Sequence, residues 1–115
     1  MIFSEIQENI SILEKRYPLI YLDHKSNCEN ILLELNNFDS KLITPILFIT
    51  DEDTLQLDFD SMRYYLEIDI FKNHFEYFFI DRKEKNSSKN KTDSFSIDVV
   101  KDYLIHFIGD KWYGN

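Results

Sequence analysis

The sequence predicts an α+β domain with two N-terminal helices, a four-stranded antiparallel meander sheet and one C-terminal helix packed on one sheet face. Three observations lead to this fold class. Apolar residues recur every three or four positions near both ends of the chain, which is typical of amphipathic helices. In the middle of the chain they alternate with polar residues, which is typical of strands. Short polar turns separate these strands, as in a meander.

The first helix is expected to begin at Ser4, which forms an S-x-x-Q capping box with Gln7. Pro18 is expected to end this helix. Its apolar face is formed by residues spaced four, three and four apart, namely Ile6, Ile10, Leu13 and Tyr17.

A second capping box, Ser26 to Glu29, predicts the start of the second helix after a short apolar link, Leu19–Leu22. Its buried side is predicted to contain Cys28 together with Ile31, Leu32 and Leu35. A cluster of turn residues between positions 36 and 40 is expected to stop it.

Four strands are predicted from apolar runs and period-two alternation: Ile46–Ile49, Thr54–Phe59, Tyr64–Ile70 and Phe75–Asp81. The turns between them are expected at Asp51–Asp53, Asp60–Met62 and Asn73–His74.

Residues 82–93, RKEKNSSKNKTD, are polar and contain five Lys or Arg against two acids. They predict a flexible basic loop, and residues 84–92 are expected to be the most mobile internal segment because they have no apolar side chain to bury. Ser96 is then expected to cap the last helix, which runs to Ile108. Trp112 and Tyr113 in the tail are expected either to cover the core or to belong to an interface.

Length and composition limit the classes of function. The 115 residues fit a single domain over residues 1–115, and 13 Lys or Arg against 21 Asp or Glu give a net charge of −8. Nucleic acid and anionic membranes repel such a domain, so we expect neither as a direct partner. The chain has one cysteine and no long apolar run or signal-like start, so we expect a cytoplasmic protein.

The acidic charge is concentrated in residues 51–81, which contain nine acids and two bases. Because alternate strand residues share a face, many of these acids should point away from the helices, interleaved with aromatic side chains. Such a surface suits a basic protein partner, although an ordinary solvated sheet face is the alternative. The candidate partner-binding residues are Asp58, Tyr65, Glu67, Asp69, Phe71, Glu76 and Phe78.

No residues are assigned to catalysis, to a metal or to a cofactor. Carboxyl groups on an open sheet face should lack the burial that separates their pKa values. His24, His74 and His106 lack the spacing of a metal site. Cys28 is expected to be a small core residue.

Residues 45–68 resemble a hairpin pattern of small bacterial proteins from mobile and competition loci: a proline, an apolar strand, an acidic turn, a strand ending in an aromatic residue, and then LEI. The chain departs from that pattern at Phe59, where tryptophan is commoner, and at Glu52, where glycine is commoner. The matching positions are Pro45, Ile46, Asp51, Leu55, Leu57, Phe59, Leu66, Glu67 and Ile68.

Immunity and antitoxin-type proteins of bacterial toxin systems are similar in size, in acidity and in their lack of catalytic residues. The resemblance implies a non-catalytic inhibitor that binds a basic toxin, such as a nuclease. Two alternatives stay open. One is a phage-type inhibitor whose acidic face mimics nucleic acid towards a host defence protein. The other is an uncharacterised enzyme or small-molecule binder.

Overall fold

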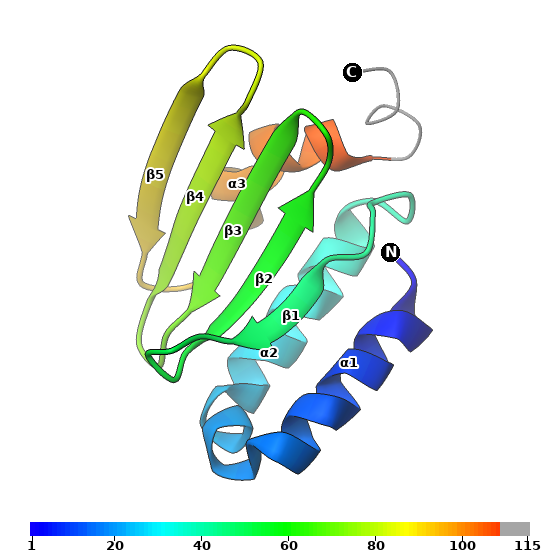
Figure 1. The fold of residues 1–115 in the computed structure, drawn as a ribbon, viewed down its shortest axis with the longest axis vertical. Helices are drawn as coiled ribbons and strands as arrows, with labels where there is room; N and C mark the ends of the chain where they lie inside the picture. The colour runs from blue at the N-terminus through cyan, green and yellow to red at the C-terminus, as the bar shows by residue number, and fades with distance from the viewer. Residues whose placement is uncertain (109–115) are drawn as a thin grey trace.

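Helices and a five-stranded antiparallel sheet form two layers in the computed structural model, which describes residues 1–108 (Figure 1). The helical elements are α1 (Phe3–Arg16), α2 (Pro18–Phe38), α3 (Ile97–Leu104) and the short 3₁₀ turn η1 (Ile105–Phe107). The strands lie in sequence order and are β1 (Ile46–Ile49), β2 (Leu55–Asp60), β3 (Tyr64–Ile70), β4 (Phe75–Asp81) and β5 (Asn86–Thr92). The predicted α+β class and the antiparallel meander are confirmed, but the predicted number of strands is wrong.

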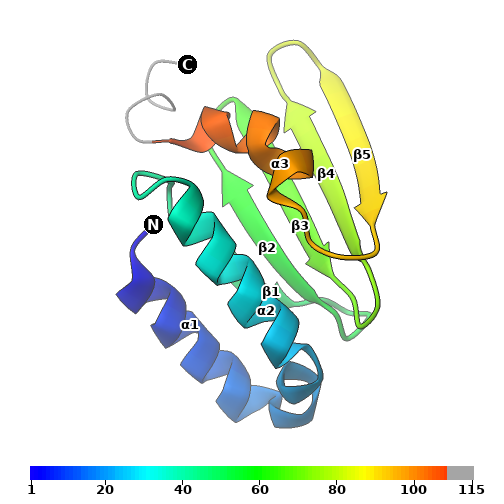
Figure 2. The same cartoon turned by 180° about the vertical axis from the view of Figure 1, so that it is seen from behind.

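The helices cover only one face of the sheet. Figure 2 shows α2 and α3 lying across the back of the strands, with α1 beside α2. Alternate residues of β2 and β3 point into this layer and are buried, as the period of two predicted. Phe59 of β2 contacts Phe107 of η1, with ring centroids 5.7 Å apart, so the end of the described chain packs on the sheet. The opposite face of the sheet, here called the outer face, carries no helix from residues 1–108.

The predicted helix starts are wrong at both capping boxes. Ile2 is the N-cap of α1, so Ser4 lies inside that helix and makes no capping bond. The second helix begins at Pro18, eight residues before Ser26, and includes the stretch predicted as a link. Proline is well suited to the first helical turn, because the missing N–H would have no intrahelical partner there. Ser96 does lie at the N-cap of α3, without a side-chain bond.

The segment predicted as a flexible basic loop contains the fifth strand. All seven residues of β5 pair with β4, from Phe75 opposite Thr92 to Asp81 opposite Asn86. Backbone pairing with an existing strand requires no apolar side chain, so a polar segment can form an edge strand. The predicted mobility of residues 84–92 therefore conflicts with this pairing.

Asp81 organises the turn into β5. Its Oδ1 accepts hydrogen bonds from the backbone N–H groups of Lys83 and Glu84, at 3.1 and 3.2 Å. The guanidinium of Arg63 donates to both carboxylate oxygens at 3.0 Å, and it holds the pKa of Asp81 at about 2. Lys85 takes the left-handed conformation that closes the turn, with φ of 58°. This hairpin places β5 next to β4, at the edge of the sheet.

Candidate functional site

The predicted partner-binding residues lie together on the outer face or at its margin. Asp58 is opposite Glu67 across β2 and β3, and Asp69 is opposite Glu76 across β3 and β4. Directly opposite residues share a face, so these four carboxyl groups form one cluster, here called the acidic cluster. Each of the four residues is half-buried.

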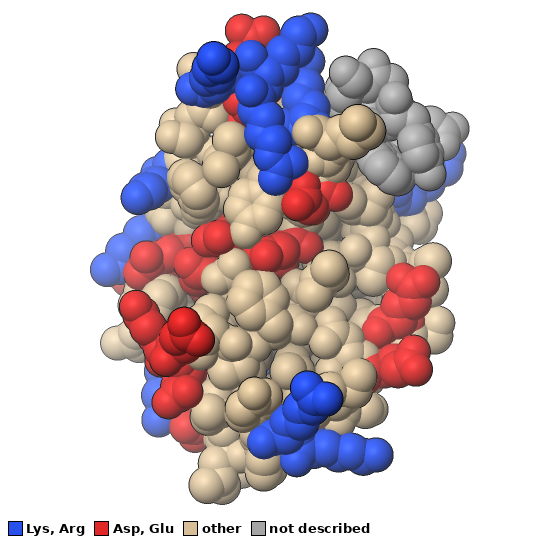
Figure 3. Space-filling view, in the orientation of Figure 1, with Lys and Arg blue, Asp and Glu red and all other residues tan. Residues whose placement is uncertain are grey.

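Two rows of side chains cross the outer face at right angles to the strands. One row contains Gln56, Asp69, Glu76 and Lys91, and the next contains Asp58, Glu67, Phe78 and Lys89. Figure 3 shows carboxylates across the middle of this face and at its lower left, with Lys and Arg gathered at the end near the β4–β5 hairpin. The surface is therefore an acidic centre with a basic margin.

Hydrogen bonds within the outer face hold several carboxylates in place. Tyr65 donates its hydroxyl to Glu67 Oε1 at 2.7 Å, and Gln56 Nε2 donates to Asp58 Oδ1 at 2.8 Å. Burial and the bond to Glu67 raise the pKa of Tyr65, so its hydroxyl stays protonated. Fixed carboxylates lose less side-chain entropy when a partner binds than free ones would.

Asp69 has the most unusual environment in the acidic cluster. Its Oδ1 is closed off from solvent and accepts no hydrogen bond from residues 1–108. Burial is the first cause that raises its pKa to about 7, and the negative charges of Glu67 and Glu76 add to it. A carboxyl with this pKa can gain or lose a proton near neutral pH.

The expectation that outer-face carboxyls would lack burial is therefore wrong for two members of the acidic cluster. Burial also raises the pKa of Asp58, even though Gln56 and Tyr65 bond to its carboxylate. The reason is that neighbouring aromatic and long side chains on an antiparallel sheet shield the carboxyl groups between them.

Two shallow hollows meet at Asp69. One, of about 290 Å³, is also lined by Glu67, Glu76, Phe78 and Lys89. The other, of about 280 Å³, contains Asp69 together with Phe71 and the acidic β1–β2 turn. A protruding cationic side chain could enter either hollow and contact a carboxylate on one side and an aromatic ring on the other.

Phe71 lies just beyond β3 and stacks on His74, with ring centroids 4.2 Å apart. The same imidazole forms a 2.8 Å contact from Nε2 to Glu76 Oε2. These contacts connect the predicted aromatic residue to the acidic cluster through a histidine that the sequence prediction placed only in a turn.

Three basic residues of the outer face were missed by sequence reasoning. Lys89 lies 5.6 Å from the Phe78 ring centroid, and Arg82 lies 5.5 Å from that of Tyr65 while pairing with Asp60 at 2.7 Å. Lys91 is opposite Glu76. Lys89 and Lys91 alternate with Ser88 and Asn90, which is the period of a strand. The segment has no apolar residue, however, and this lack favoured a loop.

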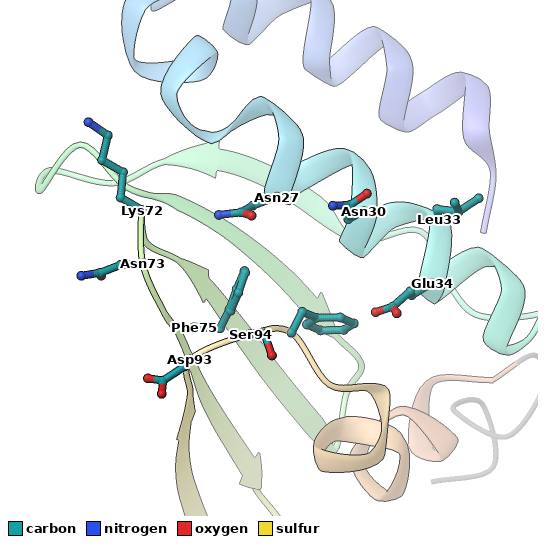
Figure 4. A pocket seen from close by; sticks show the side chains of 10 residues that line it. Asn27, Asn30, Leu33, Glu34, Lys72, Asn73, Phe75, Asp93 and Ser94 are labelled. Carbon is teal, nitrogen blue, oxygen red and sulfur yellow. The ribbon is translucent and has the colours of Figure 1, made fainter.

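A different hollow, of about 400 Å³, lies between α2 and the β3–β4 turn. Figure 4 shows Asn27 of α2 extending toward the β3–β4 turn, which carries Lys72 and Asn73, with Asn30 further along the same helix. Asn27 Nδ2 lies 3.5 Å from the carbonyl of Phe71. The side-chain amide of Asn27 thus helps to join α2 to the β3–β4 turn.

The other chemistry-bearing residues have structural surroundings. Cys28 is fully buried, as predicted, and burial raises the pKa of its thiol to about 12. In the described range, 1–108, no three His, Cys, Asp or Glu residues are arranged to hold a metal ion. Nor does any helix of that range combine the length and apolar character needed to cross a bilayer. The predicted tail residues Trp112 and Tyr113 lie outside the described part of the chain.

Comparison of the chain with protein-family models, with curated proteins and with solved structures finds no match.

Proposed function

We propose that the chain is a non-catalytic cytoplasmic inhibitor of the immunity or antitoxin kind, which binds a basic toxin domain through its outer sheet face. The observation that carries this proposal is the acidic cluster around Asp69. Four half-buried carboxyl groups lie side by side there, next to aromatic rings and two hollows.

Charge and shape support a protein partner. Carboxylates attract and orient a basic surface, and aromatic rings such as those of Tyr65 and Phe78 supply contact area at low entropic cost. A cationic partner would also stabilise the ionised form of Asp69, which burial and the neighbouring acids Glu67 and Glu76 destabilise. No helix of the described part of the chain covers the outer face, which supports access by a large partner.

The two alternatives fit the outer face less well. A nucleic-acid mimic needs extended lines of negative charge, since duplex DNA carries about one charge per 1.7 Å of its axis. Here the acids form a compact cluster bordered by Lys89 and Lys91. An enzyme could use the raised pKa of Asp69, but its carboxyl lies on an open face instead of in an enclosed cleft.

A growth assay tests the proposed function. The gene beside that of this chain is expressed in a susceptible bacterium, alone and together with this chain. We expect the neighbouring protein to arrest growth and this chain to restore it. A chain with Asp69→Lys and Glu76→Lys should lose protection, whereas Asp98→Lys with Asp102→Lys on α3 should keep it. Equal protection by both variants would contradict a role for the outer face.

A further inference from the structure

The two edges of the sheet differ in how their backbone is covered. The edge strand β1 has only four residues, and the amide of Asn9 from α1 occupies it. Asn9 Nδ2 donates to the carbonyl of Leu47 at 2.8 Å, and its Oδ1 accepts the Leu47 N–H at 2.9 Å. A side-chain amide thereby takes the place of a neighbouring strand, which closes this edge to further pairing.

The other edge, formed by β5, is open. Within the described residues, β5 is hydrogen-bonded only to β4, and Figures 1 and 2 show no described element beyond it. Six of its seven residues are exposed, and Thr92 is half-buried. One row of its backbone N–H and C=O groups therefore faces solvent, in a form that another strand could pair with.

We propose that the open edge of β5 accepts an extended acidic segment of a partner protein, which joins the sheet as a sixth strand. The groups that would pair are the backbone N–H and C=O groups of β5 and not the carboxyl groups of the acidic cluster, although Lys89 and Lys91 adjoin that cluster. The proposal stands whether or not the proposed toxin inhibition is correct. Backbone hydrogen bonds would give the affinity, and the side chains of β5 would select the sequence.

The length and composition of β5 suit strand addition. Seven residues span about 24 Å at the rise of an antiparallel strand. The strand contains no proline, which would remove a backbone donor, and no glycine, which would weaken it. Its pairing with β4 fixes an extended backbone before any partner arrives. A partner segment therefore bears most of the ordering cost.

Charge selects an acidic segment. Lys89 and Lys91 lie opposite Phe78 and Glu76, so both lysines are on the outer face. Lys83 and Lys85 add positive charge at the hairpin beside them. An added strand with carboxylates on the outer face would place them across from these lysines, and opposite-charge pairs across neighbouring strands are favourable.

A second copy of this chain fits the edge less well. In an antiparallel pairing of two β5 strands centred on their middle residue, Lys89 would lie directly opposite Lys89 of the second copy. Like charges in such positions are destabilising, and lysines on exposed edges are a known means of preventing self-association. The same lysines attract an acidic strand.

The test uses a cyclised β-hairpin peptide whose free strand alternates glutamate with threonine, titrated into the full chain. We expect saturable binding and slower amide hydrogen exchange in β5. A Lys89→Glu, Lys91→Glu variant should bind about tenfold more weakly or worse, because two attractive cross-strand pairs become repulsive. The matched control, Lys15→Glu with Lys25→Glu on the exposed helix surfaces, should bind as the unmodified chain does.

A second peptide separates strand pairing from charge attraction alone. It has the same sequence, but the outward-facing amides of its glutamate strand are N-methylated, so it cannot form the backbone ladder. We expect it not to bind. Equal binding of both peptides would overturn the proposal, as would the absence of binding at millimolar peptide. Concentration-dependent dimers that disappear in the Lys89→Glu, Lys91→Glu variant would also overturn it, because the edge would then belong to a second copy.

Discussion

Asp69 brings together the unusual features of the outer face. It lies opposite Gln56 on one neighbouring strand and Glu76 on the other, and its Oδ1 is closed off from solvent. A free carboxylate in this position is destabilised by burial and by the surrounding acids, which is why its pKa rises to about 7. The ionised carboxyl of Asp69 therefore lowers the stability of the free protein, and a nearby positive charge would offset this loss.

Replacing Asp69 with asparagine should make the free protein more stable above pH 7. In the unfolded chain the aspartate pKa is near 3.8, whereas it is about 7 in the folded protein. The folded state therefore binds the proton more tightly, and the unmodified protein loses stability as the pH rises from about 4 to about 7. We expect the Asn variant to gain roughly 1 to 2 kcal/mol over that range, because solvent screening reduces the linkage value of about 1.4 kcal/mol per pKa unit.

Urea unfolding at pH 4, 6 and 8 measures this gain. The exposed Asp102→Asn change serves as the control and should not alter the pH profile. A constant difference between Asp69→Asn and the unmodified protein at all three pH values would show that the carboxyl titrates normally.

Among the elements, β5 is the strand that the sequence did not predict. Strands β2 to β4 could be predicted because one side of each is apolar, and the same period of two placed Asp58, Glu67 and Glu76 on a common face. The polar β5 gives no such signal, since its order depends on pairing with β4 and on the bonds of Asp81. The start of α2 was missed because the Ser26–Glu29 motif predicts a helix start, whereas it lies inside a helix that begins at Pro18. The pKa of Asp69 depends on neighbours across strands, which a linear pattern does not reveal.

Replacing Asp81 with alanine should loosen the β4–β5 hairpin. The change removes both bonds from Arg63 and the acceptor for two backbone N–H groups. We expect amide exchange in β5 to become about tenfold faster, while exchange in β2 and β3 stays the same. Asp93→Ala, at the other end of β5, is the matched control. Unchanged exchange in β5 would show that pairing with β4 alone orders this strand.

The hairpin should also respond to acid. The pKa of Asp81 is lowered to about 2, so its contribution to stability is present above about pH 4 and is lost as the pH falls through about 2. Amide exchange measured at several acidic pH values, after correction for the intrinsic pH dependence, should show selective opening of β5. Equal opening of all strands would contradict this role for Asp81.

At the scale of the molecule, residues 1–108 form one core between the helices and the inner face of the sheet. Phe59 belongs to that core, with none of its side chain exposed, whereas Met62 is 87% exposed in the next turn. Phe59→Ala should lower the free energy of unfolding by about 3–5 kcal/mol, because it leaves a cavity against Phe107. Met62→Ala should change it by less than about 0.5 kcal/mol. Similar losses in urea unfolding would contradict this division of the two positions.

The central claim, that the acidic cluster recognises a basic partner, is tested most directly by one comparison of binding. The basic partner obtained in the growth assay is titrated with two variants of equal charge at several salt concentrations. The first carries Asp58→Asn, Glu67→Gln, Asp69→Asn and Glu76→Gln, and the second carries the same kinds of change at exposed helical positions, Glu5, Glu8, Asp98 and Asp102. We expect both to stay folded, and only the first to lose at least about 2 kcal/mol of binding free energy and most of its salt dependence. Equal affinity and equal salt response in the two variants would contradict the claim.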